Sequence, residues 1–231
     1  MDTAKFYDFF RPENCLEDIH IIGCGAVGST LATELARYGL QNFVLYDFDT
    51  VTSHNIANQA YVAEDIGHLK TEALAKEMLR INPEMSGHLR TVSSGWNGQR
   101  LTGYVFLCVD NIDLRRQIAE NNRYNKFIKA MFDFRMGLTD GQHYAADWND
   151  RVQVDNFIAT MQFTHAEAQQ NSVVSACNLE LSVCSTVRTL VSAGVSNFVN
   201  FVKHNQLRTM VMTDSFKFSY FGYPEKLEGV A

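Results

Sequence analysis

The chain has 231 residues, 46% hydrophobic and 20% charged, which is typical of one α/β domain with a sizeable core. Its net charge of −6 argues against a nucleic-acid partner, because phosphate binding needs clustered basic residues. No apolar run is long enough to span a bilayer, and the acidic start is not a signal peptide. Five cysteines without a CxxC pair suggest a reducing compartment. We therefore expect a cytoplasmic protein without a membrane partner.

The N-terminal part of the chain predicts a strand, a glycine turn, a helix and a second strand. These parts are residues 19–22, Gly23-x-Gly25-x-x-Gly28, 29 to about 38, and 43–46 ending at Asp47. In such a unit the first glycine permits a tight turn, the second lets backbone approach a phosphate, and the third lets the helix pack on the strand. The helix N-terminus attracts an anion, and Asp47 can accept hydrogen bonds from ribose hydroxyls. The pattern therefore predicts a nucleotide site, with a purely structural turn as the alternative.

Helices and strands continue to alternate after this unit. The expected elements are a helix at 71–81 closed by Asn82-Pro83, a strand at 89–92, a buried strand at 103–109, a polar helix at 111–121 and a strand at 127–132. Such alternation predicts a Rossmann-like, doubly wound, mainly parallel sheet.

Beyond residue 135 the pattern changes. We expect an antiparallel strand at 141–148, no clear period over 149–176, and an amphipathic helix from 181 to about 204 whose small residues allow close packing. At the other end, residues 1–18 predict an N-terminal arm or short helix that Pro12 breaks.

The segment after Asp47 separates this chain from a simple dinucleotide-binding protein. Its sequence is DFDTVTSHNIANQAYVAEDIGHLKTEALAKEMLRINPE, and CVDNIDLR follows at 108–115. These ordered blocks resemble the ThiF/MoeB/HesA family of ATP-dependent adenylyltransferases, which includes the adenylation domains of ubiquitin-activating enzymes. The resemblance covers 19–137, and more weakly 175–203. It implies one domain over 1–231, made of an arm at 1–18, a nucleotide-binding core at 19–137, and a sheet extension, crossover segment and C-terminal helix at 138–231.

The family's chemistry explains the residue types in these blocks. A carboxylate attacks the α-phosphate of ATP and expels pyrophosphate, so catalysis needs cations and Mg²⁺ more than an acid or base. The resemblance places Asp47 on the ribose, Lys70 on the phosphates and Asp110 on Mg²⁺, which prefers carboxylate oxygens. The remaining positions, around the polyphosphate and at the start of the next helix, are Asn55, Asn58, Gln59 and Arg115. Structural alternatives stay open: Asp47 as a turn former, Lys70 as a surface residue, Asp110 as a helix cap and Arg115 as a packing residue.

The chain departs from the family pattern at two places. Asn58 stands where the family usually has arginine, and a charge-assisted contact is roughly twice as strong as a neutral one. Either Arg11, Arg135 or a partner's arginine compensates, or the protein turns over slowly or not at all. The family's zinc-binding CxxC pairs are absent, so we expect no zinc.

Cys177 falls close to a cysteine position of the family's crossover segment. Some members use such a thiol to capture the activated acyl group. The alternative is a small buried residue that precedes the last helix.

Together these features predict a homodimer that uses ATP and Mg²⁺ to adenylate the C-terminal carboxylate of a small ubiquitin-like or sulfur-carrier protein. The first alternative is a catalytically degenerate relative that binds nucleotide and a protein partner. An NAD-dependent oxidoreductase is disfavoured by the 50–115 block, and a dehydratase of modified tRNA by the acidic charge.

Overall fold

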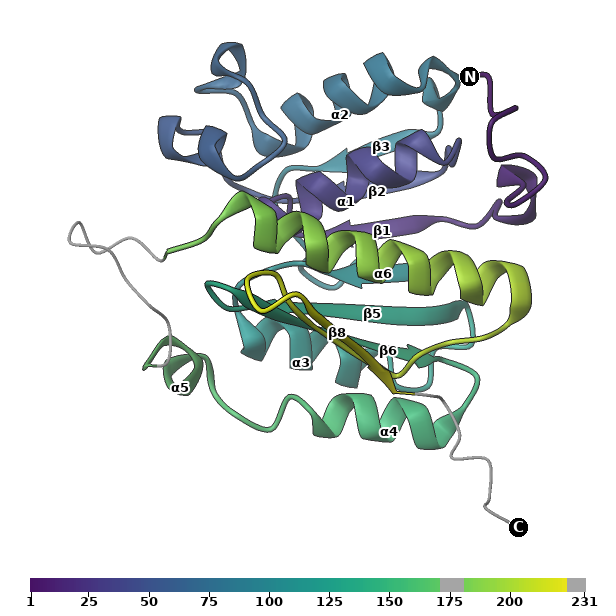
Figure 1. The fold of residues 1–231 in the computed structure, drawn as a ribbon, viewed down its shortest axis with the longest axis vertical. Helices are drawn as coiled ribbons and strands as arrows, with labels where there is room; N and C mark the ends of the chain where they lie inside the picture. Colours follow the sequence, from purple (N-terminus) through teal and green to yellow (C-terminus); the bar gives the residue numbers. More distant parts are fainter. Residues whose placement is uncertain (171–180, 224–231) are drawn as a thin grey trace.

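An eight-stranded sheet in the order β3-β2-β1-β4-β5-β6-β7-β8 runs through the computed structural model, which describes residues 1–170 and 181–223 (Figure 1). Its strands are β1 (Ile19–Ile22), β2 (Phe43–Tyr46), β3 (Leu89–Val92), β4 (Gly103–Leu107), β5 (Ile128–Met136), β6 (Asp140–Asp147), β7 (Met210–Asp214) and β8 (Ser219–Tyr223). Strands β1 to β5 pair in parallel, and β5 to β8 pair antiparallel. The predicted doubly wound sheet with an antiparallel extension is confirmed.

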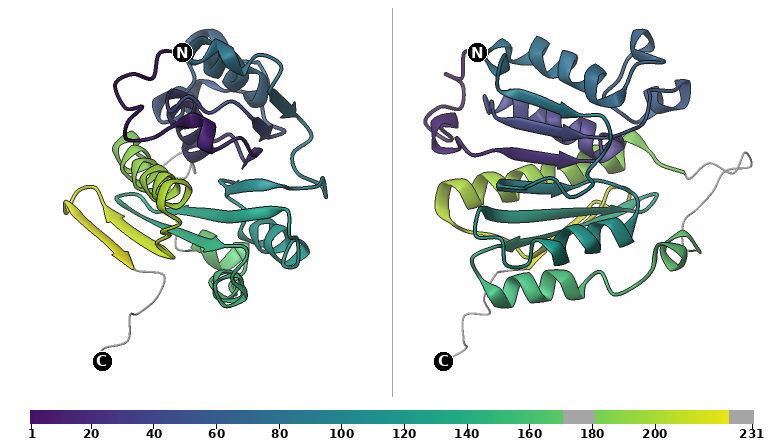
Figure 2. Two further views of the ribbon diagram at one scale, coloured as in Figure 1. Left: turned by 90° about the vertical axis from the view of Figure 1, so that its right-hand side faces the viewer. Right: turned by 180° about the vertical axis from the view of Figure 1, so that it is seen from behind.

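Helices cover the sheet on both faces. They are α1 (Ala26–Arg37), α2 (Lys70–Ile81), α3 (Ile112–Asn121), α4 (Arg151–Ala159), α5 (His165–Gln170) and α6 (Cys184–His204), with short 3₁₀ helices η1 (Pro12–Asn14), η2 (Ser53–Ala57), η3 (Ala63–Asp65) and η4 (Pro83–Met85). Because side chains alternate along a strand, β4 sends Phe106 into the core under α1, α2 and α6, and Val105 into the core under α3 and α4. Figure 2 shows α6 and α3 on opposite sides of the sheet.

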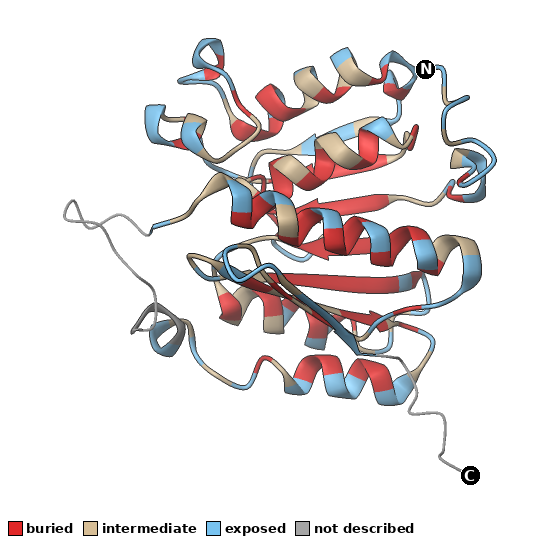
Figure 3. Cartoon of the chain, viewed as in Figure 1, coloured by how far each residue is buried: buried red, intermediate tan, exposed pale blue. Residues whose placement is uncertain are grey.

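Helix α6 is the predicted amphipathic helix. Its buried side includes Val187, Leu190 and Phe198. In Figure 3, buried and exposed residues alternate along this helix, because one side faces the sheet and the other faces away from it. Gly194 allows the close approach expected from small residues, since a Cβ there would lie 2.3 Å from Cε1 of Phe134. Among the helices of 1–170 and 181–223, none is long and apolar enough to cross a membrane.

Several element boundaries differ from the predictions. Helix α1 starts at Ala26 instead of residue 29, so Gly28 lies inside the helix, and β5 continues to Met136 because it pairs with β6. Pro12 begins η1 instead of breaking a helix, as expected for a proline at a first helical position. The range 149–176, predicted without period, contains α4 and α5.

Candidate functional site

The carboxyl ends of β1, β2 and β4 meet at one edge of the sheet. The order of the strands reverses between β1 and β4, and ligands of doubly wound folds bind at such a point. The glycine turn follows β1, Asp47 follows β2, and Asp110 lies three residues after β4. The fold therefore brings most of the predicted site residues to one edge, on the left of Figure 1.

The three glycines of the turn have different surroundings. Gly23 has a φ of +97°, and a Cβ there would lie 2.7 Å from the backbone of Cys108 and Val109. A Cβ on Gly28 would lie 1.8 Å from the carbonyl oxygen of Gly23. A Cβ on Gly25 would meet nothing within 4 Å. Two glycines are thus required by the packing of the turn, while Gly25 borders open space.

Alanine should affect stability at Gly28 and nucleotide binding at Gly25. We expect Gly28→Ala to destabilise the fold by about 3 kcal/mol or more, because its Cβ collides with a backbone oxygen that cannot move aside easily. Gly25→Ala should keep the free energy of unfolding within about 1 kcal/mol of the wild type and weaken nucleotide binding. Denaturant unfolding and nucleotide titration of both variants test this difference. Equal unfolding free energies would contradict the close packing at Gly28.

Hydrogen bonds tie the glycine turn to its neighbours. The Cys24 amide donates to Asp47 Oδ2 at 2.6 Å, so Asp47 holds the turn. The Tyr61 hydroxyl donates to the Cys24 carbonyl at 2.7 Å and lies 3.3 Å from the Lys70 carbonyl oxygen. Burial raises the pKa of Tyr61, so its hydroxyl remains a donor. Tyr61 lies in the resemblance block, but nothing in the sequence pattern singles it out.

Lys70 is the first residue of α2 and is almost completely buried. Its Nζ lies 2.7 Å from Asp49 Oδ2, and the exposed fractions of the two side chains are 9% and 51%. The surface-residue alternative for Lys70 therefore does not hold. Sequence reasoning left Asp49 out of the site, but the structure makes it the immediate partner of Lys70.

The asparagine and glutamine positions surround η2. Asn55 Oδ1 accepts hydrogen bonds from the Thr52 amide and hydroxyl, both at 2.9 Å, and so fixes the start of η2. Asn58 is half-buried at the end of η2. Gln59 Oε1 is buried with no hydrogen-bond partner among the described residues. Since buried polar atoms are almost always paired, this oxygen marks a position for a ligand or a water.

Asp110 is exposed at the end of the loop after β4. The cap of α3 is Asn111, whose side chain accepts from the Leu114 amide at 3.0 Å, so Asp110 is not required as a cap. Within 1–170 and 181–223, no three histidine, cysteine or acidic side chains are grouped to hold a metal. Mg²⁺ is commonly held by one or two carboxylates and the substrate phosphates, and the exposed carboxylate of Asp110 fits that mode.

Arg115 is buried and holds the loop that carries Asp110 by a hydrogen bond to its backbone. Its guanidinium donates to the Val109 carbonyl (Nε to O 2.7 Å) and to the Phe134 carbonyl, and pairs with Asp133, which has no exposed surface. These contacts place Arg115 behind the site instead of facing a phosphate.

Arg135 is also engaged by protein groups. Its Nε pairs with Asp133 Oδ2 at 2.6 Å, and its two terminal nitrogens donate to Thr160 O and Oγ1, both at 2.8 Å. All three nitrogens therefore have partners, so Arg135 could replace the charge missing at Asn58 only by breaking or sharing these contacts.

Removing Asp133 should cost much more stability than removing a surface partner. Asp133→Ala leaves the buried Arg115 without its counter-charge and should lower the free energy of unfolding by about 3–5 kcal/mol. Asp155→Ala, which breaks an exposed pair with Arg123, should cost less than about 1 kcal/mol. Denaturant unfolding measures both; a loss below about 1 kcal/mol for Asp133→Ala would contradict a structural role for the pair.

Arg11 lies at the other end of the strands. The neighbouring Phe10 packs edge-on against Tyr38 at the end of α1, with ring centroids 5.6 Å apart. Helix α1 is about 18 Å long, so exposed Arg11 is remote from the glycine turn of its own chain. Arg11 therefore does not reach the glycine turn of its own chain.

The cysteines of the site are not nucleophiles. Cys24 is buried and Cys108 is half-buried, and burial raises the pKa of both thiols, that of Cys108 to about 12, which favours the protonated form. Cys177 lies outside the described residues.

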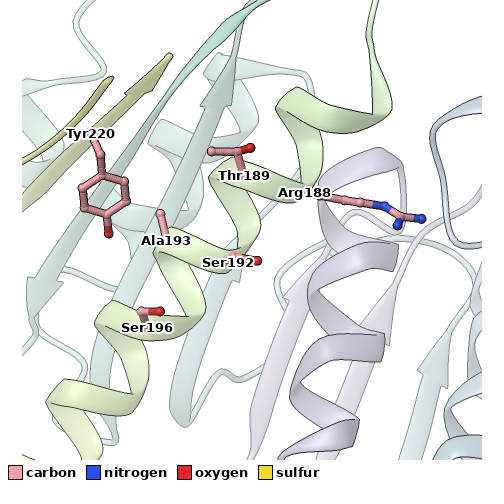
Figure 4. A pocket seen from close by; sticks show the side chains of 6 residues that line it. All are labelled: Arg188, Thr189, Ser192, Ala193, Ser196 and Tyr220. Carbon is pink, nitrogen blue, oxygen red and sulfur yellow. The ribbon is translucent and has the colours of Figure 1, made fainter. Parts of the chain in front are cut away.

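A cavity of about 600 Å³ lies away from this edge, between α6 and β8 (Figure 4). Its lining residues are Arg188, Thr189, Ser192, Ala193, Ser196 and Tyr220. None of the predicted site residues lines it, so it is separate from the glycine turn.

Comparison with known proteins agrees with this geometry. The sequence model of the ThiF family matches residues 16–132. Ubiquitin-like modifier-activating enzyme 5 of Culex quinquefasciatus is 29% identical over 134 residues, covering 51% of this chain and 33% of that protein. tRNA threonylcarbamoyladenosine dehydratase 2 of Saccharomyces cerevisiae is 30% identical over 121 residues, covering 48% of this chain and 26% of that protein. The aligned region thus spans about a third or less of these relatives.

Solved structures share the fold over nearly the whole chain. The crystal structure of PaaA has a TM-score of 0.70 at 16% identity and covers 96% of this chain and 68% of its own. Escherichia coli MccB with ATP has a TM-score of 0.65 at 12% identity, covering 95% and 67%.

Proposed function

The chain belongs to the ThiF family, and we propose that it uses ATP and Mg²⁺ to adenylate the C-terminal carboxylate of a small ubiquitin-like or sulfur-carrier protein. The observation that carries this proposal is the buried Lys70 ammonium beside a glycine turn whose Gly25 borders open space. A Rossmann dehydrogenase needs no buried cation at this position, because it binds the pyrophosphate of its cofactor on the glycine turn.

The site residues fit the charge changes of the reaction. A carboxylate oxygen of the partner bonds to the α-phosphorus, the bond from that phosphorus to the bridging oxygen breaks, and pyrophosphate leaves. Lys70 and the N-terminus of α1 offset the negative charge on the phosphate oxygens. Mg²⁺, when bound, would neutralise further phosphate charge, and Asp110 is the carboxylate available to hold it. Asp47 would accept hydrogen bonds from the ribose.

A protein substrate is supported by the exposed surface at the end of the sheet. The turn after β7 and strand β8 expose five large aromatic side chains, which are Phe216, Phe218, Tyr220, Phe221 and Tyr223. Aromatic side chains are enriched at protein interaction sites, and a carrier protein is the partner that the proposed reaction requires.

Homodimerisation is part of the proposal. Arg11 is remote from its own glycine turn, so it can supply the charge missing at Asn58 only from a second subunit. Light scattering at micromolar concentration should give a mass of about twice 26.2 kDa. Particles of monomer mass alone would remove Arg11 from the site.

Nucleotide preference tests the proposed function directly. Calorimetry should give tighter binding of ATP with Mg²⁺ than of NAD⁺, because NAD⁺ has no γ-phosphate for Lys70. Tighter binding of NAD⁺ would favour the oxidoreductase alternative. Binding of ATP without turnover would favour the degenerate alternative, for which Asn58 is the main support.

A further inference from the structure

The ammonium of Lys70 is held by a carboxylate of the same chain. Asp49 Oδ2 lies 2.7 Å from Lys70 Nζ, and the Lys70 amide donates to the Asp49 carbonyl at 2.9 Å. A bridge between Thr50 and Leu69 fixes the two backbone segments side by side. The pair is therefore built into the fold, at the position where the proposed function requires a phosphate.

The same segment also holds the glycine turn. The Cys24 amide donates to Asp47, two residues before Asp49. The Asp47-Phe48-Asp49 segment thus supplies one carboxylate to the glycine turn and another to Lys70.

The two ends of the Lys70–Asp49 pair differ in exposure. The lysine side chain is 9% exposed and that of Asp49 is 51% exposed. A nearly buried ammonium needs a polar partner, which Asp49 supplies; because the Asp49 end of the pair is half-exposed, a neutral polar side chain together with water can take its place without loss of the fold. A half-exposed carboxylate can turn toward water once an anion replaces it.

We propose that Asp49 is a counter-ion that competes with the polyphosphate for Lys70. This inference rests on the proposed function, because it assumes that Lys70 receives the phosphates. Asp49 keeps Lys70 paired while the site is empty, and it lowers the affinity of the site for polyphosphate. An anion with several charges can displace Asp49, whereas singly charged anions gain too little from Lys70 to do so.

Neutralising Asp49 should strengthen anion binding. If Asp49 had only a structural role, the same substitution would weaken anion binding. We expect Asp49→Asn to bind inorganic tripolyphosphate about tenfold more tightly than the wild type at fixed ionic strength, since one repulsive charge near the anion is removed. The matched control is Glu64→Gln, which removes an exposed acid on η3 and should change affinity less than about twofold. Lys70→Gln should bind weakly with or without Asp49→Asn.

Calorimetric titration with tripolyphosphate separates this inference from the proposed function. Wild-type binding with no gain in Asp49→Asn would overturn the inference alone. Absence of binding in both proteins would overturn the inference and the phosphate site together. Asp49→Ser is a second neutral variant, and the same gain is expected from it. Loss of the folded state in both neutral variants would assign Asp49 a structural role and overturn the competition.

Discussion

Replacing Lys70 with methionine is expected to slow adenylate formation by about 10³-fold without unfolding the protein. Loss of one preorganised donor to a transition-state oxyanion costs roughly 10²–10³ in rate. We expect the upper end of this range for Lys70, because its ammonium is charged and makes stronger hydrogen bonds than a neutral donor. Methionine keeps the apolar length of a side chain that is almost entirely buried. The loss should be measured as ATP–pyrophosphate exchange, with thermal unfolding as the check on folding.

Lys76→Met is the matched control for that variant. Lys76 lies on the same helix with 66% of its side chain exposed, and its Nζ is 3.9 Å from Asp65. We expect exchange within about twofold of the wild type, because exposed ion pairs contribute little. If Lys70→Met retains the exchange rate of this control, Lys70 does not act on the phosphates.

Replacing Asp110 with asparagine is expected to abolish the dependence of turnover on Mg²⁺ and to lower the rate by about 10²-fold or more. The carboxylate is exposed, and Asn111 caps α3 in its place, so the free energy of unfolding should change by less than about 0.5 kcal/mol. Measuring rate against Mg²⁺ concentration separates loss of the metal ligand from a general defect.

Glu120→Gln is the matched control, because it neutralises an exposed acid on α3, the helix that follows the loop of Asp110. Glu120 is exposed near the end of α3, away from the loop after β4. Its variant should keep the wild-type response to Mg²⁺. A wild-type Mg²⁺ response in Asp110→Asn as well would remove Asp110 from the metal site.

The parallel half of the fold was predictable because each part has a local signal. The apolar runs at 19–22 and 43–46 are strands with those bounds, since buried parallel strands are continuously hydrophobic. The predicted strand at 89–92 also has those bounds, although it is an edge strand without a buried residue. The glycine turn was equally clear, because two of its three positions leave no room for a Cβ.

The antiparallel half was less predictable. Helix α4 has only nine residues, and its best signal was the Asp150 cap, which accepts from the Val152 and Gln153 amides. Strand β8 exposes aromatic side chains instead of alternating apolar and polar residues, so no period identified it.

Ion pairs between residues that are distant along the chain explain what the sequence could not predict within the site. Asp49 is the charge partner of Lys70, and Asp133 is the charge partner of Arg115. Arg115 and Arg135 were candidates for phosphate contacts by type and position. Only the structure shows that both converge on Asp133, which leaves neither free.

The central claim is that the chain catalyses adenylation although Asn58 replaces the family arginine. The most direct test is ATP–pyrophosphate exchange by the wild-type protein, with and without candidate ubiquitin-like and sulfur-carrier proteins. We predict Mg²⁺-dependent exchange that requires a carrier protein. Arg11→Ala should slow this exchange by several kcal/mol in activation free energy, because arginine fingers contribute roughly 10³–10⁵ in rate. Clear ATP binding with undetectable exchange for every carrier, and activity gained by Asn58→Arg, would contradict it.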